Sequence, residues 1–225
     1  MPGGMTWKGW LAGKALPLAI CALLALAVGL GVRDEAARMV HEGMAPYAAL
    51  DLVRRCLTFL FVLLIAASYL TRGPVAAAAR GFGERMFPVL VLLAGPVGIV
   101  LLGRHTVPES LGLAAVGLLL ALPGAGISLW SLWHLRESFS IMAEARSPVT
   151  SGPYRHVRHP LYLGEALMML GICLMIGTLA AVLFWAALNA LQVTRARIEE
   201  AKLSRQFPEY RAYQERTRFL IPGLY

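Results

Sequence analysis

The chain has 225 residues and a formal net charge of +8, with 58% hydrophobic residues and only 15% charged residues. A soluble domain is closer to half apolar and a quarter charged, so this balance indicates a membrane protein. The arginines flank the apolar runs and form no basic stripe with aromatic residues, which argues against nucleic acid as a partner. Basic loops of this kind are typical of the cytoplasmic face, where they meet membrane lipids with anionic headgroups.

Four apolar runs in the first part of the chain are long enough to be read as bilayer spans. They cover residues 15–32, 50–70, 86–103 and 111–133. Asp51, Arg54 and Arg55 stand at the start of the second run. We expect these three to pair with one another or to reach the membrane interface. Trp130 and Trp133, at the end of the fourth run, are typical of an interfacial aromatic belt.

The fifth apolar run covers residues 161–193. As one straight helix it would be about 50 Å long, whereas the hydrocarbon core of a bilayer is about 30 Å thick. Gly177 and Thr178 lie at its middle. We therefore predict a hairpin of two helices, 161–176 and 179–193, joined by a tight turn. The alternative is one long helix that projects into the cytosol.

These runs predict an all-α, polytopic transmembrane protein with four spans and a C-terminal helical hairpin. The polar segments 134–160 and 194–225 carry eleven Lys and Arg residues. The positive-inside rule assigns both segments, the loop 71–85 and both termini to the cytosol. Arg33 and Arg38 fall in the first outer loop and run against this rule.

Two polar segments, 144–165 and 195–222, flank the hairpin, so the hairpin should bring them together at one face of the membrane. Arg155, Arg158 and Arg197 lie in these segments, and guanidinium groups bind carboxylates or phosphates with two hydrogen bonds. On composition alone, Arg155 and Arg158 could equally be anchors at the phosphates of the lipid headgroups.

Glu199 and Glu200 stand where a helix would leave the membrane, and they could hold an ammonium group. The alternative is a solvated helix face. Tyr154 and Tyr162 could stack on an adenine or cover a cationic sulfonium. Gly164 would let the backbone come close to a ligand.

Glu165 is the only acidic residue in the hairpin. An acid inside the membrane is a candidate functional group, although this one lies a single turn from the end and could reach the surface. Pro160 would begin the hairpin helix, where its missing N–H costs nothing. His156 and His159 have a spacing that could bind metal, but no third ligand with suitable spacing follows, so no metal site is predicted.

Five separated elements, in register, resemble the isoprenylcysteine carboxyl methyltransferase and phospholipid methyltransferase family of integral membrane enzymes. They are Val149-Thr-Ser-Gly-Pro-Tyr154, Arg158-His-Pro-Leu-Tyr-Leu-Gly164, Arg197-Ile-Glu-Glu200, Tyr210-x-x-Tyr213 and Ile221-Pro222. The resemblance covers about residues 135–222. It divides the chain into N-terminal transmembrane helices, 1–134, and a methyltransferase-like catalytic region, 135–225.

The resemblance implies methyl transfer from S-adenosyl-L-methionine to a lipid-like or prenylcysteine-type acceptor, with carboxyl methylation favoured and a cytosolic catalytic face. Arg197 would face the acceptor, with Arg158 and Glu165 as further catalytic candidates. A carboxylate acceptor needs no base, whereas an amine or hydroxyl needs a proton acceptor such as Glu165. The residues implied in cofactor binding are Val149, Tyr154, His159, Pro160, Leu161, Tyr162, Gly164, Glu199 and Glu200.

Two other functions stay open. Membrane sterol reductases carry a similar Arg-His-Pro-x-Tyr-x-Gly piece, so an NADPH-dependent reductase of a lipid double bond is one alternative. The paired acids at 199 and 200 argue against it, because a dinucleotide phosphate prefers basic groups. A small transporter is the other alternative, but it predicts polar residues at the membrane midplane rather than at one face.

Overall fold

The computed structural model describes residues 7–43, 46–71, 82–103, 110–141 and 149–221, and within these ranges every regular element is a helix. This confirms the all-α prediction for the described residues. The elements are α1 (Trp7–Glu42), α2 (Pro46–Thr71), α3 (Phe82–Gly103), α4 (Leu111–Ile141), η1 (Gly152–Arg155), α5 (Pro160–Ile176), α6 (Leu179–Gln206) and α7 (Tyr210–Arg216). Most of the predicted loop 71–85 and all of residues 222–225 lie outside the described part.

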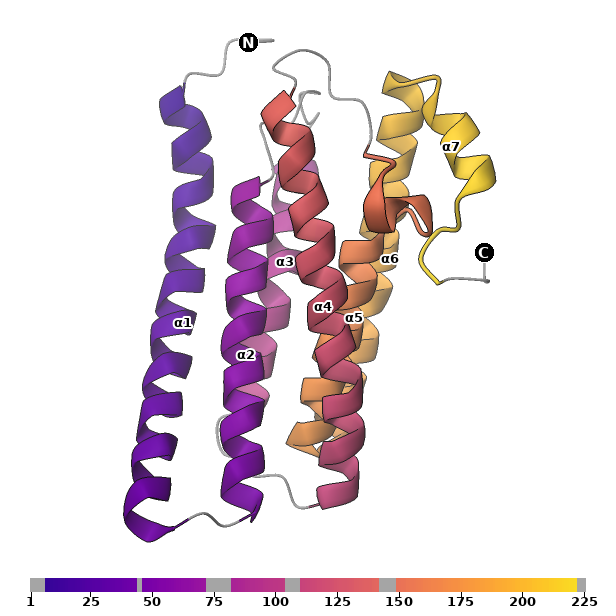
Figure 1. Cartoon of the computed structure of the whole chain (residues 1–225). Coiled ribbons are helices and arrows are strands. Elements are labelled where there is room, and N and C mark those ends of the chain that lie inside the picture. Colours follow the sequence, from indigo (N-terminus) through magenta and orange to yellow (C-terminus); the bar gives the residue numbers. More distant parts are fainter. Residues whose placement is uncertain (1–6, 44–45, 72–81, 104–109, 142–148, 222–225) are drawn as a thin grey trace.

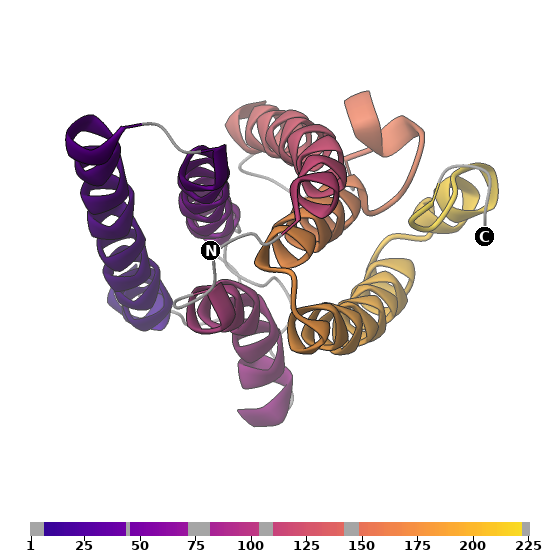
Figure 2. The same ribbon diagram turned by 90° about the horizontal axis from the view of Figure 1, so that it is seen from below.

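Helices α1 to α6 run roughly along one axis, as Figure 1 shows. Seen along that axis in Figure 2, α1 lies on the outside next to α2, while α5 lies between α4 and α6. The short elements η1 and α7 both lie at the end of the bundle where α4 and α6 finish. This arrangement places the polar part of the chain at one end of an apolar bundle.

Helices α4 and α5 pack most closely, because glycines lie where they cross. A Cβ on Gly117 would lie 2.5 Å from the Gly171 carbonyl oxygen, and one on Gly171 would overlap the Gly117 carbonyl. A Cβ on Gly164 would lie 2.5 Å from the Ser128 hydroxyl. A side chain at any of these positions would push the two helices apart, so the glycines fix the position of α5 against α4.

The predicted hairpin is confirmed. Helix α5 ends at Gly177, whose φ of 77° is the left-handed conformation that favours glycine. Thr178 begins α6 as its N-cap, and its hydroxyl accepts a hydrogen bond from the Ala181 amide at 3.2 Å. However, α6 continues to Gln206, well beyond the predicted end at residue 193. The polar segment after residue 193 is therefore a direct extension of the hairpin helix.

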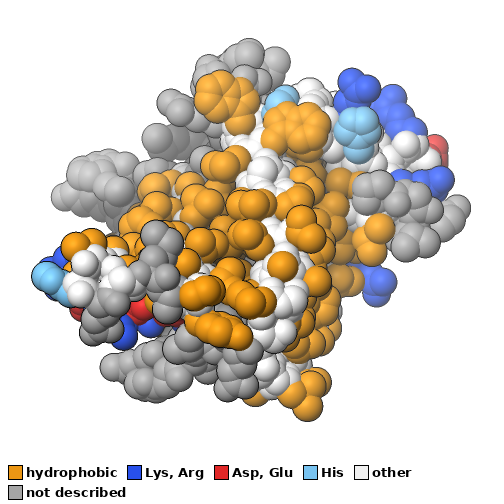
Figure 3. All heavy atoms as spheres, turned by 60° about the horizontal axis from the view of Figure 1, so that its bottom comes forward, with side chains coloured by type: hydrophobic (Ala, Val, Ile, Leu, Met, Phe, Trp, Pro, Cys, Tyr) orange, Lys and Arg blue, Asp and Glu red, His pale blue; other side chains and the backbone are white. Residues whose placement is uncertain are grey.

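Two of the described helices are long and apolar enough to cross a membrane, by length and composition. They cover Leu111–Leu135 in α4 and Leu179–Arg205 in α6, whereas α5 has only 17 residues. Figure 3 shows hydrophobic side chains over most of the face that it presents. Trp130 and Trp133, the predicted aromatic belt, are both exposed on α4. The bundle thus presents an apolar outer surface like that of a membrane protein.

The acidic and basic residues at the start of α2 pair with one another, which was the first of the two possibilities that the sequence left open. Asp51 accepts hydrogen bonds from Arg54 Nε at 2.9 Å and from Arg55 Nε at 2.6 Å, and both Asp51 and Arg54 are buried. Arg55 also lies 4.0 Å from the buried Glu35 of α1. This cluster joins α1 to α2 at the end of the bundle opposite η1 and α7 (Figure 1).

The same end of the bundle contains the two arginines that run against the positive-inside rule. Arg33 pairs with Asp34 at 2.8 Å, and Arg38 pairs with Glu35. Each arginine therefore lies beside an acid, which reduces the excess positive charge that this end would present to a membrane.

The packing of α4 on α5 predicts opposite effects for two Gly→Ala substitutions. Both gain helix propensity of up to about 1 kcal/mol. A Cβ on Gly126 meets nothing within 4 Å, so Gly126→Ala should leave the thermal unfolding midpoint unchanged or raise it. Gly171→Ala should lower the midpoint, because overpacking costs about 1–3 kcal/mol. Circular dichroism of both variants in detergent measures this, and equal midpoints would contradict the packing described.

Candidate functional site

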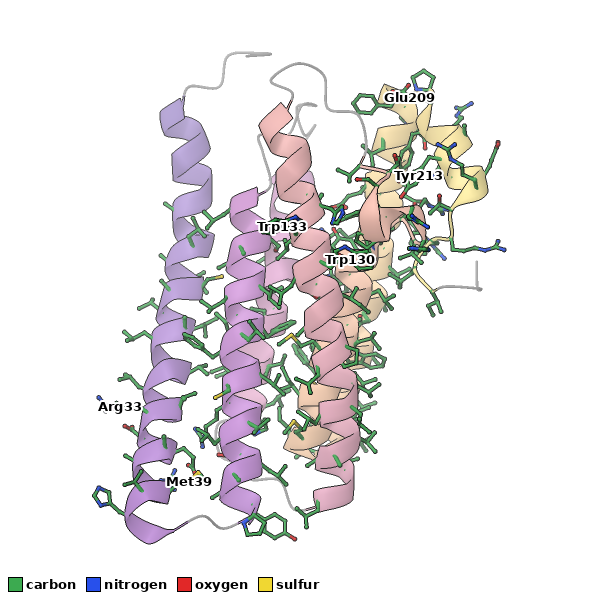
Figure 4. The ribbon with its side chains drawn as sticks, in the orientation of Figure 1. Arg33, Met39, Trp130, Trp133, Glu209 and Tyr213 are labelled. Carbon is green, nitrogen blue, oxygen red and sulfur yellow. The ribbon has the colours of Figure 1, made fainter. Side chains whose placement is uncertain are left out.

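The two polar segments that flank the hairpin meet at one end of the bundle, as predicted. The Arg158 amide donates to the Arg218 carbonyl at 2.8 Å, and the His159 amide donates to the Phe219 carbonyl at 3.2 Å. These contacts fold the segment after α7 back against the start of α5, beside η1 (Figure 4). Residues about 60 positions apart in sequence therefore form one site.

An ion pair between Arg158 and Glu200 lies at the centre of this site. Arg158 Nε donates to Glu200 Oε1 at 2.5 Å, and Nη1 donates to the carbonyls of Gln214, at 2.9 Å, and Thr217. Glu200 is buried and also lies 3.1 Å from His159 Nε2 and 3.1 Å from Gln214 Nε2. Such charge-assisted bonds are the strong ones in a protein, and they connect α5, α6 and α7.

A second polar group, next to the first, connects Tyr162 of α5 with Glu199 and Arg195 of α6. The Tyr162 hydroxyl donates to Glu199, 2.9 Å from both carboxylate oxygens, and Arg195 Nε lies 3.3 Å from Oε1. The Arg195 guanidinium lies 5.5 Å from the centre of the Tyr162 ring. The side chain of Glu199 is 39% exposed, whereas that of Arg195 is 1% exposed. This group therefore has one accessible carboxylate and one fully buried cation.

Arg195 is not fully satisfied by the residues that the structure describes. Its Nη1 lies 3.4 Å from the Gln192 side-chain oxygen, but its buried Nη2 finds no hydrogen-bond acceptor among them. A buried N–H without a partner costs free energy, so an acceptor from a ligand would stabilise it.

Aromatic rings cover the same region. His159 and Tyr162 are stacked, with ring centres 5.4 Å apart and planes within 6°. Phe219 packs against the edge of His159, with centres 5.1 Å apart, and Arg158 lies 5.6 Å over the Phe219 ring. Pro160 is the first residue of α5, and the three-residue spacing of His159 and Tyr162 puts both rings on one side of its first turn.

Helix α7 is fastened to η1 by a tyrosine. The Tyr213 hydroxyl donates to the Tyr154 carbonyl at 2.5 Å, and both residues are buried. Burial raises the pKa of Tyr213 to about 12, so the phenol stays protonated and able to donate at neutral pH. Figure 4 shows Tyr213 on the inner side of the C-terminal arm, residues 207–221.

A narrow crevice enters the bundle next to these polar groups, between α2, α3, α5 and α6. Its polar lining residues are Tyr162, Glu165, Asn189 and Gln192. Its other lining residues are Phe61, Ile65, Val91, Gly95, Ala166, Met169 and Leu188. One end of the crevice is thus polar and borders the site, while its walls are apolar.

Glu165 lies at the polar end of the crevice. It is 4% exposed, and Gln192 Nε2 lies 3.5 Å from its Oε2. It follows Tyr162 by three residues on α5, so the two side chains lie about one helical turn apart on the same side. The alternative that Glu165 reaches the surface does not describe this structure.

Most of the residues predicted for the site lie together in it: Tyr154, Arg158, His159, Pro160, Tyr162, Glu165, Glu199 and Glu200. Val149 is half-buried before η1. Leu161 is part of the apolar core, and Gly164 faces Ser128 of α4, so a close helix contact explains that glycine without a ligand. Arg155 and Arg197 are exposed. Pro222 lies outside the described residues.

Arg195 was missed by the sequence analysis. The signal for it depends on the continuity of α6 past residue 193. In a continuous helix, residues 192, 195 and 199 lie on one side, and 197 points elsewhere. The sequence placed Glu199 and Glu200 on a helix that leaves the membrane, but it did not give the rotation of that helix, which decides that Arg195 rather than Arg197 turns inward.

Comparison with known proteins identifies the region that contains the site. Residues 113–210 match the family described as phospholipid methyltransferase. A cobalt-zinc-cadmium resistance protein, CzcN of Cupriavidus metallidurans, is 37% identical over 109 residues, which are 48% of this chain and 50% of the relative. The chain therefore spans about half the length of the curated relative that it matches. No solved structure matches the chain.

The matched residues run from the start of α4 to the start of α7, so they contain η1, the hairpin, the Arg158–Glu200 pair and the Tyr162, Glu199 and Arg195 group, whereas Gln214 and Thr217 lie beyond the match. The resemblance to the isoprenylcysteine and phospholipid methyltransferase group is thus confirmed over residues 113–210, which match the phospholipid methyltransferase family.

Proposed function

We propose that this protein transfers a methyl group from S-adenosyl-L-methionine to a lipid-like acceptor at the end of the bundle that holds η1 and α7. The observation that supports this most is the Tyr162, Glu199 and Arg195 group. It combines an accessible carboxylate, an aromatic face and a buried guanidinium with an unused N–H, next to an apolar crevice. S-adenosyl-L-methionine carries an ammonium, a carboxylate and a sulfonium, and a lipid-like acceptor has a polar and an apolar part. Together they need this combination of groups.

The residues present fit the cofactor. Glu199 would hold the methionine ammonium, because its carboxylate is the more accessible of the two acids. The stacked rings of His159 and Tyr162 would border the adenosyl or sulfonium part. Glu200 would act indirectly, since its hydrogen bonds with Arg158, His159 and Gln214 hold the site together. When bound, S-adenosyl-L-methionine supplies an electrophilic methyl group on a cationic sulfur.

The chain's own contribution to such a reaction is positioning and exclusion of water. Methyl transfer is an in-line displacement, and well-oriented reactants gain effective molarities of about 10⁵ M or more. The C-terminal arm lies against the start of α5 through Arg158 and through the Tyr213 hydrogen bond to Tyr154. This arm would shield the cofactor from solvent.

We assign the acceptor-orienting role to Arg195 rather than to Arg197, which the sequence favoured. Arg197 is exposed, whereas Arg195 is buried next to Gln192 and Tyr162, which both line the crevice. Arg158 is engaged with Glu200 and two carbonyls, so we assign it to positioning.

We also propose that α1, α2 and α3 join α4 and the hairpin as membrane spans, with the site on the cytosolic side. The eleven basic residues in the polar segments support this orientation. So does the pairing of Arg33 and Arg38 with acids at the opposite end.

Cofactor choice is the first test of the proposal. We expect the detergent-purified protein to bind S-adenosylhomocysteine and to bind NADPH weakly or not at all, as measured by calorimetry. Glu199→Gln should weaken the binding of S-adenosylhomocysteine by about 10- to 150-fold, because a hydrogen bond to a charged group contributes about 1.5–3 kcal/mol. Glu209→Gln, an exposed acid at the same end, is the control and should bind normally. Binding of NADPH without the adenosyl ligand would instead favour the reductase.

The two arginines of α6 give a second test. Arg195→Lys should lower turnover by about 10- to 100-fold, because lysine lacks the forked geometry of the guanidinium, and should leave the affinity for S-adenosylhomocysteine within a few-fold. Arg197→Lys should change turnover little. Turnover with tritiated S-adenosyl-L-methionine and calorimetry separate the two quantities. The opposite pattern would return the role to Arg197, as the sequence predicted.

The closed position of the C-terminal arm gives a third test. Arg158→Lys removes the fork that reaches Glu200 and the Gln214 and Thr217 carbonyls at once. Lysine keeps the charge but cannot make these hydrogen bonds at once, and each is worth about 1.5–3 kcal/mol, so amide hydrogen exchange in residues 210–219 should become faster by about 100-fold or more. Arg155→Lys, on the exposed side of η1, is the matched control. Unchanged exchange in Arg158→Lys would show that the arm is held by other contacts.

A further inference from the structure

We infer that the end of the C-terminal arm, residues 216–221, is a membrane contact, in which basic side chains pair with anionic lipid headgroups and Ile221 inserts below them. This rests on the proposed function, because the arm is the part of the chain that we expect to enclose the cofactor. It adds a partner and a form of control, since the charge of the membrane surface would stabilise the arm in its closed position. The direction of the arm, its depth in the bundle and the order of its side chains support this contact.

The last described residues of the arm run towards the apolar part of the bundle. Val157 and Arg218 form a parallel bridge, and the Arg158 amide donates to the Arg218 carbonyl at 2.8 Å. Residues 157–159 lead directly into α5, which runs from the site into the bundle (Figure 1). Because the two segments are parallel, residues 218–221 point in the same direction as the start of α5. The chain therefore goes deeper with each residue after Arg218.

The packing of α4 on α5 gives the level at which the arm ends. Gly164 of α5 lies against Ser128 of α4, and the two helices run in opposite directions. Pro160, the first residue of α5, is about one turn before Gly164, so it lies level with the next turn of α4. That turn falls between Trp130 and Trp133, the two exposed tryptophans of the aromatic belt. The start of α5 and the arm segment beside it thus lie at the level of the membrane interface.

The exposed side chains of the arm change from basic to apolar in the direction of the membrane. Arg216 and Arg218 are exposed. Two half-buried apolar residues follow, and Ile221, next after them, is 46% exposed. Basic side chains bind anionic headgroups at the membrane surface, whereas an apolar side chain gains free energy when it enters the boundary with the acyl chains. The order of the side chains therefore matches the order of the chemical layers in a membrane.

Helix η1 adds to the positive charge beside the arm. Arg155 and His156 are exposed at its end, directly before the residue that bridges Arg218. Basic and histidine side chains gather at the upper right of Figure 3, on the same side as the arm in Figure 1. Arg155, Arg216 and Arg218 contribute three positive charges, and the neighbouring Glu215 contributes one negative charge. The remaining excess of positive charge favours an anionic membrane surface over a neutral one.

Lipid bound at this position would stabilise the closed arm. The contacts of Arg158 and the hydrogen bond from Tyr213 to Tyr154 hold the side of the arm that faces the site. The lipid would hold its outer end. Because the arm reaches the interface only in the closed position, lipid that binds there shifts the equilibrium towards closure. The charge of the membrane would thereby control how well the site is shielded from water.

The depth of Ile221 is the first test. A nitroxide spin label is attached to Ile221→Cys, in a protein whose three native cysteines are replaced by alanine, in nanodiscs that contain phosphatidylglycerol. We expect the label to be more accessible to oxygen, which dissolves among the acyl chains, than to the water-soluble nickel complex NiEDDA. Ala212→Cys, exposed on α7, is the matched control and should show the opposite preference. A label at 221 that prefers NiEDDA, or that protein shields from both reagents, would overturn the inference.

The effect of surface charge on the arm is the second test. Amide hydrogen exchange in residues 210–219 is compared between nanodiscs of phosphatidylcholine alone and nanodiscs that also contain phosphatidylglycerol. Each basic residue near an anionic surface contributes about fivefold, so exchange should be about 25-fold slower with the anionic lipid. The double variant Arg216→Gln, Arg218→Gln should lose most of this difference. Arg205→Gln, at an exposed position in the last turn of α6, removes the same type of charge further along the helix and should keep the difference.

The outcomes separate this inference from the proposed function. If exchange is the same in both lipids and the label at 221 lies in water, the arm has no lipid contact and the inference is wrong. The methyltransferase proposal would survive that result as long as S-adenosylhomocysteine binds. Failure of the wild type to bind S-adenosylhomocysteine would instead overturn the proposed function, and with it the role of the lipid contact in enclosing the cofactor.

Discussion

The buried ion pair between Arg158 and Glu200 is the interaction on which the rest of the site depends. Removing two charges from water is costly, and the cost is offset here because both members have further polar partners: two backbone carbonyls on Arg158, and His159 and Gln214 on Glu200. These partners come from the residue before α5, from α7 and from the residue after α7. The pair therefore determines where the C-terminal arm lies, and with it which side of α5 the arm covers.

That constraint acts only because the hairpin holds its two helices in register. The glycines of α4 and α5 let the two backbones approach closely, and Gly177 turns the chain in its left-handed conformation. Once α5 is fixed, Tyr162 and Glu165 lie one turn apart, facing α6. The polar groups are thus arranged along α5 by depth, from the ion pair at its start to Glu165 at the crevice. A shift of α5 by one residue would rotate all of them by about 100°.

The sequence predicted the architecture well where chemistry is local. The length of the fifth apolar run, with Gly177 and Thr178 at its middle, predicted the hairpin, and the hairpin predicted that both flanking segments would meet. The predicted second helix of the hairpin stopped at residue 193, where hydrophobicity falls, whereas α6 continues to Gln206 because residues 195–202 are good helix formers. The sequence did place Glu199 and Glu200 on a helix leaving the membrane. It did not give the rotation of that helix, so Arg197 rather than Arg195 was the apparent candidate. Gly164 illustrates another limit, since a glycine that meets a neighbouring helix looks the same in sequence as one that meets a ligand.

Glu199 and Glu200 show why adjacent, identical residues can serve different ends. Consecutive positions on a helix point about 100° apart, so one side chain turns inward to the ion pair while the other turns to Tyr162 and solvent. Sequence could not assign the two, because the rotation of α6 about its axis is determined by its contacts with α3 and α5. The buried Glu200 has four hydrogen-bonding contacts with three side chains, which leaves its carboxylate little capacity for a ligand. Glu199 keeps an exposed face. A cation that binds at this end of the bundle would therefore meet Glu199 first, and the order of the arm that encloses it would depend on Glu200.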